Sequence, residues 1–330
     1  MKETFYITKS GRLSRKDNNI VFENPDGEKT FLKSEKIDEL YLFGEIDLNT
    51  RLLNFLSQMG ITLNVFNYYG YYSGSYFPRE SKVSGYLLVE QVKAQIDLSR
   101  RIKIAKEIVR SAARNIYRNL RYYNKRQGDL SLAMSEIDYL ISKIDEMDNI
   151  NSLMGIEGNI RKIYYDQWTK IIKQDVEFEK RVKRPPDNMV NTLISFLNSM
   201  MYTTVLSEIY KTQLNPTVSF LHEPSSNRFS LALDIAEIFK PLVVDRMIFS
   251  LLNKRQITKE HFTKNSKGLE LTDKGLKTLL EEYEKRLGKV LKHRDLKREV
   301  SYRYMIRLEC YKLIKEIIGE KDYEGFKIWW

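Results

Sequence analysis

The pattern of apolar positions along the chain changes character near residue 85. Before that point, short runs that alternate or are rich in β-branched and aromatic residues predict strands. One segment, residues 49–59, instead has apolar residues at helical spacing and stops at Gly60. The predicted strands occupy residues 4–8, 19–23, 29–33, 37–43 and 61–66, and a Tyr-rich, Gly-broken segment follows over 68–77.

From about residue 84 onward, the apolar residues recur with a helical period of about 3.6. They predict one long helix over 87–120 and further helices over 130–146, 152–174, 188–212, 230–253, 273–292 and 296–319. We therefore expect an α+β multidomain protein. A small N-terminal β-rich domain over 1–85 would precede a larger all-α C-terminal domain over 86–330.

The charge of the chain follows the same division. The 330 residues carry a net charge of +11. Residues 1–85 contain 11 basic and 11 acidic residues, so the predicted helical domain holds the whole basic excess. Such an excess favours a polyanionic partner, with nucleic acid ahead of a membrane surface because no amphipathic anchor is present. The alternative is an ordinary solubilising surface.

The first long helix concentrates this charge. Residues 99–126 contain ten Lys or Arg residues and a single acid, Glu107. Five cations share one ridge, namely Arg110, Arg114, Arg118, Arg121 and Lys125. The ridge predicts a nucleic-acid-binding face. The alternatives are a solvated face or a face whose charge is balanced by acids elsewhere in the fold. A second basic stretch includes Lys289, Lys292, Arg294, Lys297, Arg298 and Arg303.

Cysteine and histidine counts exclude several classes of protein. A single cysteine, Cys310, rules out an intramolecular disulfide framework and a Cys-cluster zinc site. Three histidines are too few for His-rich metal binding. Neither a secretory signal nor an apolar run long enough for a transmembrane span is evident. We therefore expect a cytoplasmic protein.

Three segments carry candidate chemistry. Glu157 stands between two glycines at the predicted start of a helix, on one face with Arg161, Tyr164/Tyr165 and Trp168. An exposed glutamate favoured by the helix dipole is the alternative. His222 follows the apolar, strand-like run 218–221 and precedes a Pro/Ser/Asn loop, where ligands and bases are often found, although a structural histidine is more common.

The third segment places two acids inside an apolar helix. Asp234 and Glu237 lie at i and i+3, on the same side. A buried carboxylate requires a metal or a strong partner, and a salt bridge to Arg246 or another cation is the alternative. Together with Glu157 and His222, these acids form an oxygen and nitrogen ligand set that suits Mg²⁺ or Mn²⁺. Such an ion in a basic, helical protein is typical of phosphodiester chemistry.

At this point the chain resembles the CRISPR-associated adaptation endonuclease/integrase (Cas-one) family over its whole length. The resemblance rests on an ordered set of short strings rather than on any one of them. They are the Gly11-Arg12-Leu13 turn, Gly155-Ile156-Glu157-Gly158, Arg184-Pro185-Pro186-Asp187, Val190-Asn191, Ser195-Phe196, Phe220-Leu221-His222, Leu231-Ala232-Leu233-Asp234-Ile235-Ala236-Glu237, Phe239-Lys240-Pro241 and Val244-Asp245-Arg246.

The resemblance implies a metal site of Glu157, His222 and Glu237, with Asp234 as an auxiliary acid. Lys240 departs from the arginine expected before the proline, which keeps the charge but loses bidentate phosphate geometry. The resemblance also implies a homodimer formed through the β-rich domains, with two dimers bridged by a small companion adaptation protein. The implied activity is insertion of short duplex DNA, a new spacer, at the leader end of a CRISPR array.

The expected reaction is metal-dependent phosphoryl transfer, in which a 3′-hydroxyl or a water attacks a phosphodiester. Candidate DNA contacts are Arg161, Tyr164, Tyr165, Lys240 and Arg246. Two alternatives remain: a stand-alone nuclease acting on branched DNA with the same site, and a non-catalytic nucleic-acid-binding scaffold whose acids form salt bridges.

Overall fold

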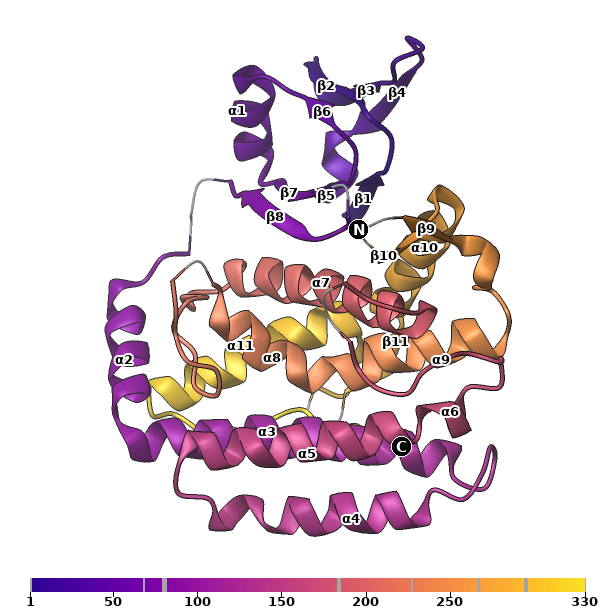
Figure 1. The fold of residues 1–330 in the computed structure, drawn as a ribbon. Coiled ribbons are helices and arrows are strands. Elements are labelled where there is room, and N and C mark those ends of the chain that lie inside the picture. The colour runs from indigo at the N-terminus through magenta and orange to yellow at the C-terminus, as the bar shows by residue number, and fades with distance from the viewer. Residues whose placement is uncertain are drawn as a thin grey trace. The chain divides into compact units, whose positions relative to one another are not determined.

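A computed structural model describes residues 2–67, 69–78, 82–182, 185–226, 228–265, 268–293 and 296–329. The chain divides into two compact units, Met1–Val83 and Ser84–Trp330. The first is rich in strands and the second in helices, which confirms the predicted fold class (Figure 1). Arg184 and Arg294, which the sequence patterns included, lie outside the described residues.

The N-terminal unit contains two four-stranded sheets and one helix. The first sheet has the order β1-β5-β7-β8, in which β1, β5 and β7 are parallel and β8 is antiparallel to β7. The second has the order β4-β3-β2-β6. The strands are β1 (Glu3–Ile7), β2 (Gly11–Lys16), β3 (Asn19–Glu23), β4 (Lys29–Lys33), β5 (Ile37–Leu42), β6 (Ile46–Asp47), β7 (Thr62–Phe66) and β8 (Tyr72–Tyr76).

Helix α1 (Thr50–Met59) begins where Asn49 accepts a hydrogen bond from the backbone N–H of Leu52 at 3.0 Å. It ends at Gly60, whose φ of 68° is the left-handed conformation that glycine adopts without strain. Leu52 and Leu56 pack into an apolar core with side chains from both sheets. All residues of this core belong to the N-terminal unit.

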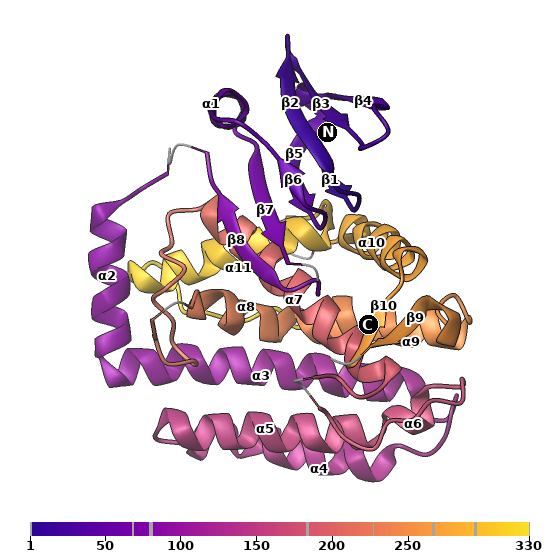
Figure 2. The ribbon, with the colours of Figure 1, turned by 45° about the horizontal axis from the view of Figure 1, so that its top comes forward.

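The second unit is built from long helices. The structure has α2 (Gly85–Ile96), α3 (Leu98–Tyr123), α4 (Ser131–Ser142), α5 (Ile150–Asp166), α6 (Trp168–Ile171), α7 (Met189–Tyr210), α8 (Ser230–Lys240), α9 (Arg246–Asn253), α10 (Asp273–Gly288) and α11 (Tyr302–Ile317). Helices α3, α4 and α5 run side by side, as both ribbon views show (Figures 1 and 2). Helix α8 packs between α3 and α7, and α11 packs on α7. Among the described residues, no helix combines the length and apolarity of a membrane span.

Some predicted elements differ in detail from the structure. The expected helix over 87–120 is two helices, because Asp97 ends α2 and caps α3 through the N–H groups of Ser99 and Arg100. The expected helix over 230–253 contains a π-helical segment, Pro241–Asp245, at a proline that has no N–H to donate.

The predictions also overlooked several strands. The Gly11-Arg12-Leu13 turn is the start of strand β2, whose residues are mostly charged or polar and gave no apolar alternation. The helical unit is not purely helical, because two short hairpins lie around α10. They are β9 (Phe262–Asn265) with β10 (Gly268–Leu271), and β11 (Val290–Lys292) with β12 (Glu299–Ser301).

Candidate functional site

Asp234 organises the loop that carries His222. Its side chain is completely buried in α8 and accepts hydrogen bonds from three consecutive backbone N–H groups. Phe220 and Leu221 donate to Oδ2 at 2.7 and 2.9 Å, and His222 donates to Oδ1 at 2.9 Å. These bonds satisfy a carboxylate that burial would otherwise destabilise. The predicted strand over 218–221 is a bent loop, and this carboxylate shapes it.

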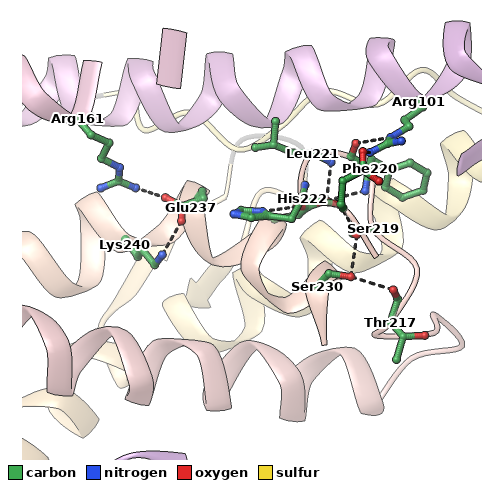
Figure 3. A network of polar contacts seen from close by, with 12 residues as sticks. Arg101, Arg161, Thr217, Ser219, Phe220, Leu221, His222, Ser230, Glu237 and Lys240 are labelled. Atoms are coloured by element: carbon green, nitrogen blue, oxygen red, sulfur yellow. Dashed lines mark hydrogen bonds and ion pairs between the residues drawn. The ribbon is translucent and has the colours of Figure 1, made fainter. Parts of the chain in front are cut away.

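Hydroxyl groups and an arginine fix the same loop from other sides (Figure 3). Ser219 Oγ donates to the carbonyl of His222 at 2.6 Å and lies 2.8 Å from Ser230 Oγ. Arg101 on α3 donates to the carbonyl of Phe220 at 2.9 Å and pairs with Glu223 at 2.6 Å. The backbone of His222 is therefore held by α3 and α8 together.

The imidazole of His222 is also oriented by Asp234. Its Nδ1 lies 2.8 Å from Asp234 Oδ1. Because an ionised carboxylate can only accept, Nδ1 carries a proton, and Nε2 is the nitrogen left available to bind a metal. Figure 3 shows the ring of His222 pointing toward Glu237. A carboxylate behind one imidazole nitrogen is the usual way to prepare the other nitrogen as a metal ligand.

Glu237 and Glu157 are linked through a cation. Arg161, one turn after Glu157 on α5, donates from Nε to Glu157 Oε1 at 3.0 Å and from Nη2 to Glu237 Oε2 on α8. Lys240 donates to the other oxygen of Glu237 at 2.5 Å. Burial raises the pKa of Glu237, but the Lys240 ammonium and the Arg161 guanidinium outweigh burial and hold this pKa far below its usual range. Glu237 is therefore ionised, as a metal ligand must be.

The structure differs in several details from what the sequence predicted around these residues. Glu157 lies in the middle of α5 rather than at its start, and Trp168 begins the separate helix α6. The cations that pair with Glu237 are Arg161 and Lys240. Arg246 instead donates a hydrogen bond from Nε to Asn119 Oδ1 at 2.6 Å.

Tyr164 is a correction to the predicted DNA contacts. Its side chain is completely buried, in ring contact with Trp168 and Phe249, and its hydroxyl accepts from Asn119 Nδ2 at 3.0 Å. It supports α5 from the core and cannot reach a DNA strand in this conformation. Tyr165 is partly exposed, and burial raises the pKa of its hydroxyl to about 12.

Sequence reasoning missed two buried polar residues next to this site. Asn119 donates to the carbonyl of Pro241 at 2.7 Å as well as to Tyr164, so it joins α3, α5 and the segment after α8. Asp245 is 2% exposed, and its Oδ2 has no hydrogen-bond partner. Burial raises the pKa of Asp245 to about 7. A polar residue on the apolar face of a helix was the available signal for both.

The ridge of cations on α3, predicted from Arg110, Arg114, Arg118, Arg121 and Lys125, is partly neutralised by acidic residues. Arg110 pairs with Glu107 and Asp145, and Arg114 pairs with Asp138 at 2.7 Å. The acids Asp138 and Asp145 come from α4 and the turn that follows it, which pack along α3. Part of the ridge is therefore answered within the fold rather than reserved for DNA.

Glu157, His222 and Glu237 offer donor atoms that suit a divalent cation. Among the described residues, however, no three His, Cys, Asp or Glu side chains lie close enough together to form a metal site. Two carboxylates and a lone-pair nitrogen suit Mg²⁺ or Mn²⁺. Arg161 and Lys240 supply the positive charge that the carboxylates of Glu157 and Glu237 require. A metal ion would therefore compete with these two cations.

Comparison with known proteins connects this arrangement to a family. The family described as "CRISPR associated protein Cas1" matches residues 5–285. A protein of Fusobacterium nucleatum named "CRISPR-associated endonuclease Cas1" is 53% identical, covering 100% of this chain and 98% of its own length. The solved structure of a CAS1 protein from Thermotoga maritima is 41% identical with a TM-score of 0.87, and the match covers 98% of this chain and 100% of that one.

Two more distant structures share the fold. A casposase bound to an integration product has a TM-score of 0.85 at 19% identity, covering 99% of this chain and 96% of that one. A Cas6-RT-Cas1–Cas2 complex contains a chain with a TM-score of 0.84 at 17% identity, covering 100% of this chain and 36% of that one. At such identities the likeness concerns the fold alone.

Proposed function

Because the chain belongs to the Cas1 family of CRISPR-associated endonucleases, we propose that it is a metal-dependent DNA endonuclease and integrase that inserts short duplex DNA into a CRISPR array. The observation that carries this proposal is the pair of contacts that prepare the ligands. Asp234 fixes Nδ1 of His222, and the ionised Glu237 is linked through Arg161 to Glu157.

Glu157, His222 Nε2 and Glu237 would hold the ion, Mg²⁺ or Mn²⁺, with Asp234 as a positioning residue behind the imidazole. Such an ion, when bound, neutralises charge that develops on phosphoryl oxygens. The protein residues bind and orient the substrate around it. In the joining reaction, the 3′-hydroxyl of the captured duplex loses its proton and forms a new bond to phosphorus, while the 3′-oxygen of the target strand leaves and gains a proton.

Charge balance suggests that metal and DNA bind together. Glu157 and Glu237 carry two negative charges, and Arg161 and Lys240 already balance them. A divalent ion at the carboxylates would leave the site with an excess of positive charge, which a DNA phosphate removes. Arg161 and Lys240, displaced from the carboxylates, would then donate to phosphate oxygens.

The likeness of the fold to a casposase bound to an integration product and to a Cas1–Cas2 assembly supports DNA and a companion Cas protein as partners. We further propose that the protein acts as a homodimer in the cytoplasm, with the N-terminal unit providing the dimer surface. The equal numbers of basic and acidic residues over 1–85 agree with a surface that does not bind DNA.

The test is a joining assay with a labelled duplex, a supercoiled plasmid carrying a leader and repeat, the companion protein and Mn²⁺. We expect Glu157→Gln and Glu237→Gln each to lower joining by more than about 100-fold, because each removes a ligand charge while keeping the shape. Glu136→Gln, an exposed glutamate of α4, is the matched control and should join normally.

Three outcomes would contradict the proposal in different ways. Normal joining by Glu157→Gln would remove this glutamate from the site. Cleavage of branched DNA without joining, unaffected by the companion protein, would indicate a stand-alone nuclease. Duplex binding that persists in EDTA, with no cleavage or joining in any divalent ion, would indicate a non-catalytic scaffold. Sedimentation of each variant checks that the oligomeric state is unchanged.

A further inference from the structure

A second group of positive charges follows α8 in the chain, and none of its members pairs with Glu157 or Glu237. It consists of Arg246 at the start of α9, Arg286 in the last turn of α10, and Lys289 just after α10. We call these three residues the α9–α10 cation cluster. The sequence placed Lys289 in a basic stretch without assigning it a role.

Hydrogen bonds and one ring contact position Arg286 and Lys289, and Arg246 is held separately by its hydrogen bond to Asn119. Arg286 donates from Nε and Nη2 to the carbonyl of Leu242, at 3.1 and 2.6 Å. Its guanidinium lies over the ring of Tyr302, 5.6 Å from the centroid. The backbone N–H of Tyr302 in turn donates to the carbonyl of Lys289 at 3.2 Å. The side chain of Arg286 and the backbone of Lys289 are therefore fixed in place by these contacts.

The cluster lacks acidic partners. Within the described ranges, no carboxylate forms an ion pair with Arg246, Arg286 or Lys289. The nearby acids of α10 are engaged elsewhere, since Glu282 pairs with Lys285 at 2.7 Å and Glu284 pairs with Arg303 at 2.8 Å.

Electrostatics agree with this geometry. Burial lowers the pKa of Arg286, and its cationic neighbour Arg246 lowers it further. Burial likewise lowers the pKa of Lys289, to which Arg286 and Arg246 both add. Three cations that repel one another without an internal acid are stabilised by a bound anion.

The position of the cluster favours a phosphate of the DNA backbone as this anion. Leu242, which anchors Arg286, lies two residues beyond Lys240 in the continuous helical segment that carries Glu237. Arg246 is six residues beyond Lys240, or about 9 Å along a helix axis. Successive phosphates of one strand are about 3.4 Å apart along a duplex. A strand bound at Glu237 therefore reaches the cluster within a few nucleotides.

We propose that the α9–α10 cation cluster is a second contact for the DNA backbone, which binds a phosphate a few nucleotides from the phosphodiester that reacts. The proposal rests on the proposed function, because it takes the bound polyanion to be the DNA substrate. Arg246, Arg286 and Lys289 supply the donors, and the guanidinium of Arg286 lies over the ring of Tyr302. Such a contact positions the strand and carries no sequence preference.

The test measures duplex affinity in EDTA, where no reaction occurs, so its outcome is separate from the joining assay. Lys289 is exposed, and its substitution should leave the fold intact. We expect Lys289→Glu to bind a mixed-sequence duplex about tenfold more weakly than the wild type. Lys289→Gln should reduce the slope of log affinity against log salt concentration by about 0.9, the value for one lost phosphate contact.

Lys285→Glu and Lys285→Gln are the matched controls. Lys285 is on the same helix, is exposed, and is already neutralised by Glu282. Each pair of variants has the same net charge, so equal losses in affinity would show that only bulk charge matters and would overturn the proposal. Unchanged duplex affinity in both Lys289 variants would also overturn it. Thermal stabilisation by inorganic phosphate that depends on Lys289, with normal duplex affinity, would identify a free-phosphate site instead.

Discussion

Replacing Asp234 by asparagine tests the feature on which the whole site depends. The substitution keeps the size of the side chain but offers one acceptor oxygen where the carboxylate has two. Asp234 accepts two hydrogen bonds on each oxygen, and all four donors are N–H groups of residues 220–222. In the variant, the NH₂ group of the new side-chain amide would face two of these donors and could accept from neither.

The expected loss follows from these contacts. A hydrogen bond to a charged group contributes about 1.5–3 kcal/mol, so two lost bonds correspond to about 3–6 kcal/mol of unfolding free energy. For a unit of this size, each kcal/mol shifts Tm by about 2–4 °C, and a decrease of about 10 °C is expected. Removal of the group behind a ligating imidazole lowers metal affinity or activity by about 10–100-fold.

The assay combines calorimetry with Mn²⁺ titration of the full-length protein and the joining reaction. Ser219→Ala is the comparison, because it removes the hydroxyl contacts with the His222 carbonyl and Ser230 while leaving the His222–Asp234 pair intact. We expect its Tm to fall by less and its Mn²⁺ affinity to stay close to that of the wild type. If Asp234→Asn has the Tm and the Mn²⁺ affinity of the wild type, the carboxylate neither shapes the loop nor positions His222, and the reasoning fails.

Two further predictions concern the buried surroundings of the site. The folded-state pKa of Asp245, about 7, lies above its ordinary value of 3.8, so the native state holds an extra proton between these values and loses stability as pH rises through them. Asp245→Asn should therefore stabilise the protein by up to about 4 kcal/mol at pH 8, but not near pH 4. Calorimetry at both pH values tests this prediction, and an equal effect at both would refute it. Phe326 stacks on Phe239 of α8 at a centroid distance of 5.8 Å and is 8% exposed. Phe326→Ala should lower the free energy of unfolding, measured by denaturant titration, by about 3–5 kcal/mol. Tyr311→Ala, at a more exposed aromatic residue, should lower it only slightly. Similar losses in the two variants would mean that the segment containing Phe326 does not support α8.

Much of the fold could be predicted from residue patterns. Strands β3 and β4 have the predicted bounds because an Asn-Pro-Asp-Gly turn separates two short runs that each favour a strand. Helix α7 is apolar on nearly all sides and packs centrally, as its composition indicates. Strand β2 was missed because its only fully buried side chain is Leu13, so its residues show no apolar alternation. It pairs with β3, which follows it in a hairpin, and with β6, which lies far along the chain.

The candidate site, like the fold, could be predicted only in part from the sequence. The chemical character of Glu157, His222, Asp234 and Glu237 was evident in the sequence, since carboxylates inside an apolar helix require partners. The identity of those partners was not evident. Glu157 and Glu237 are 80 positions apart, and only the packing of α5 and α8 against α3 places Arg161 between them.

The sequence alone thus determined which side chains can ionise, which segments form helices and strands, and where the net charge resides, because these depend on residue type and short-range spacing. The tertiary structure decided which nitrogen of His222 is protonated, which cations neutralise Glu237, and which arginines have no acid to pair with. Those properties depend on distances of a few ångströms between residues far apart in the chain. Electrostatic and hydrogen-bond energies change steeply over such distances, and local sequence does not encode them.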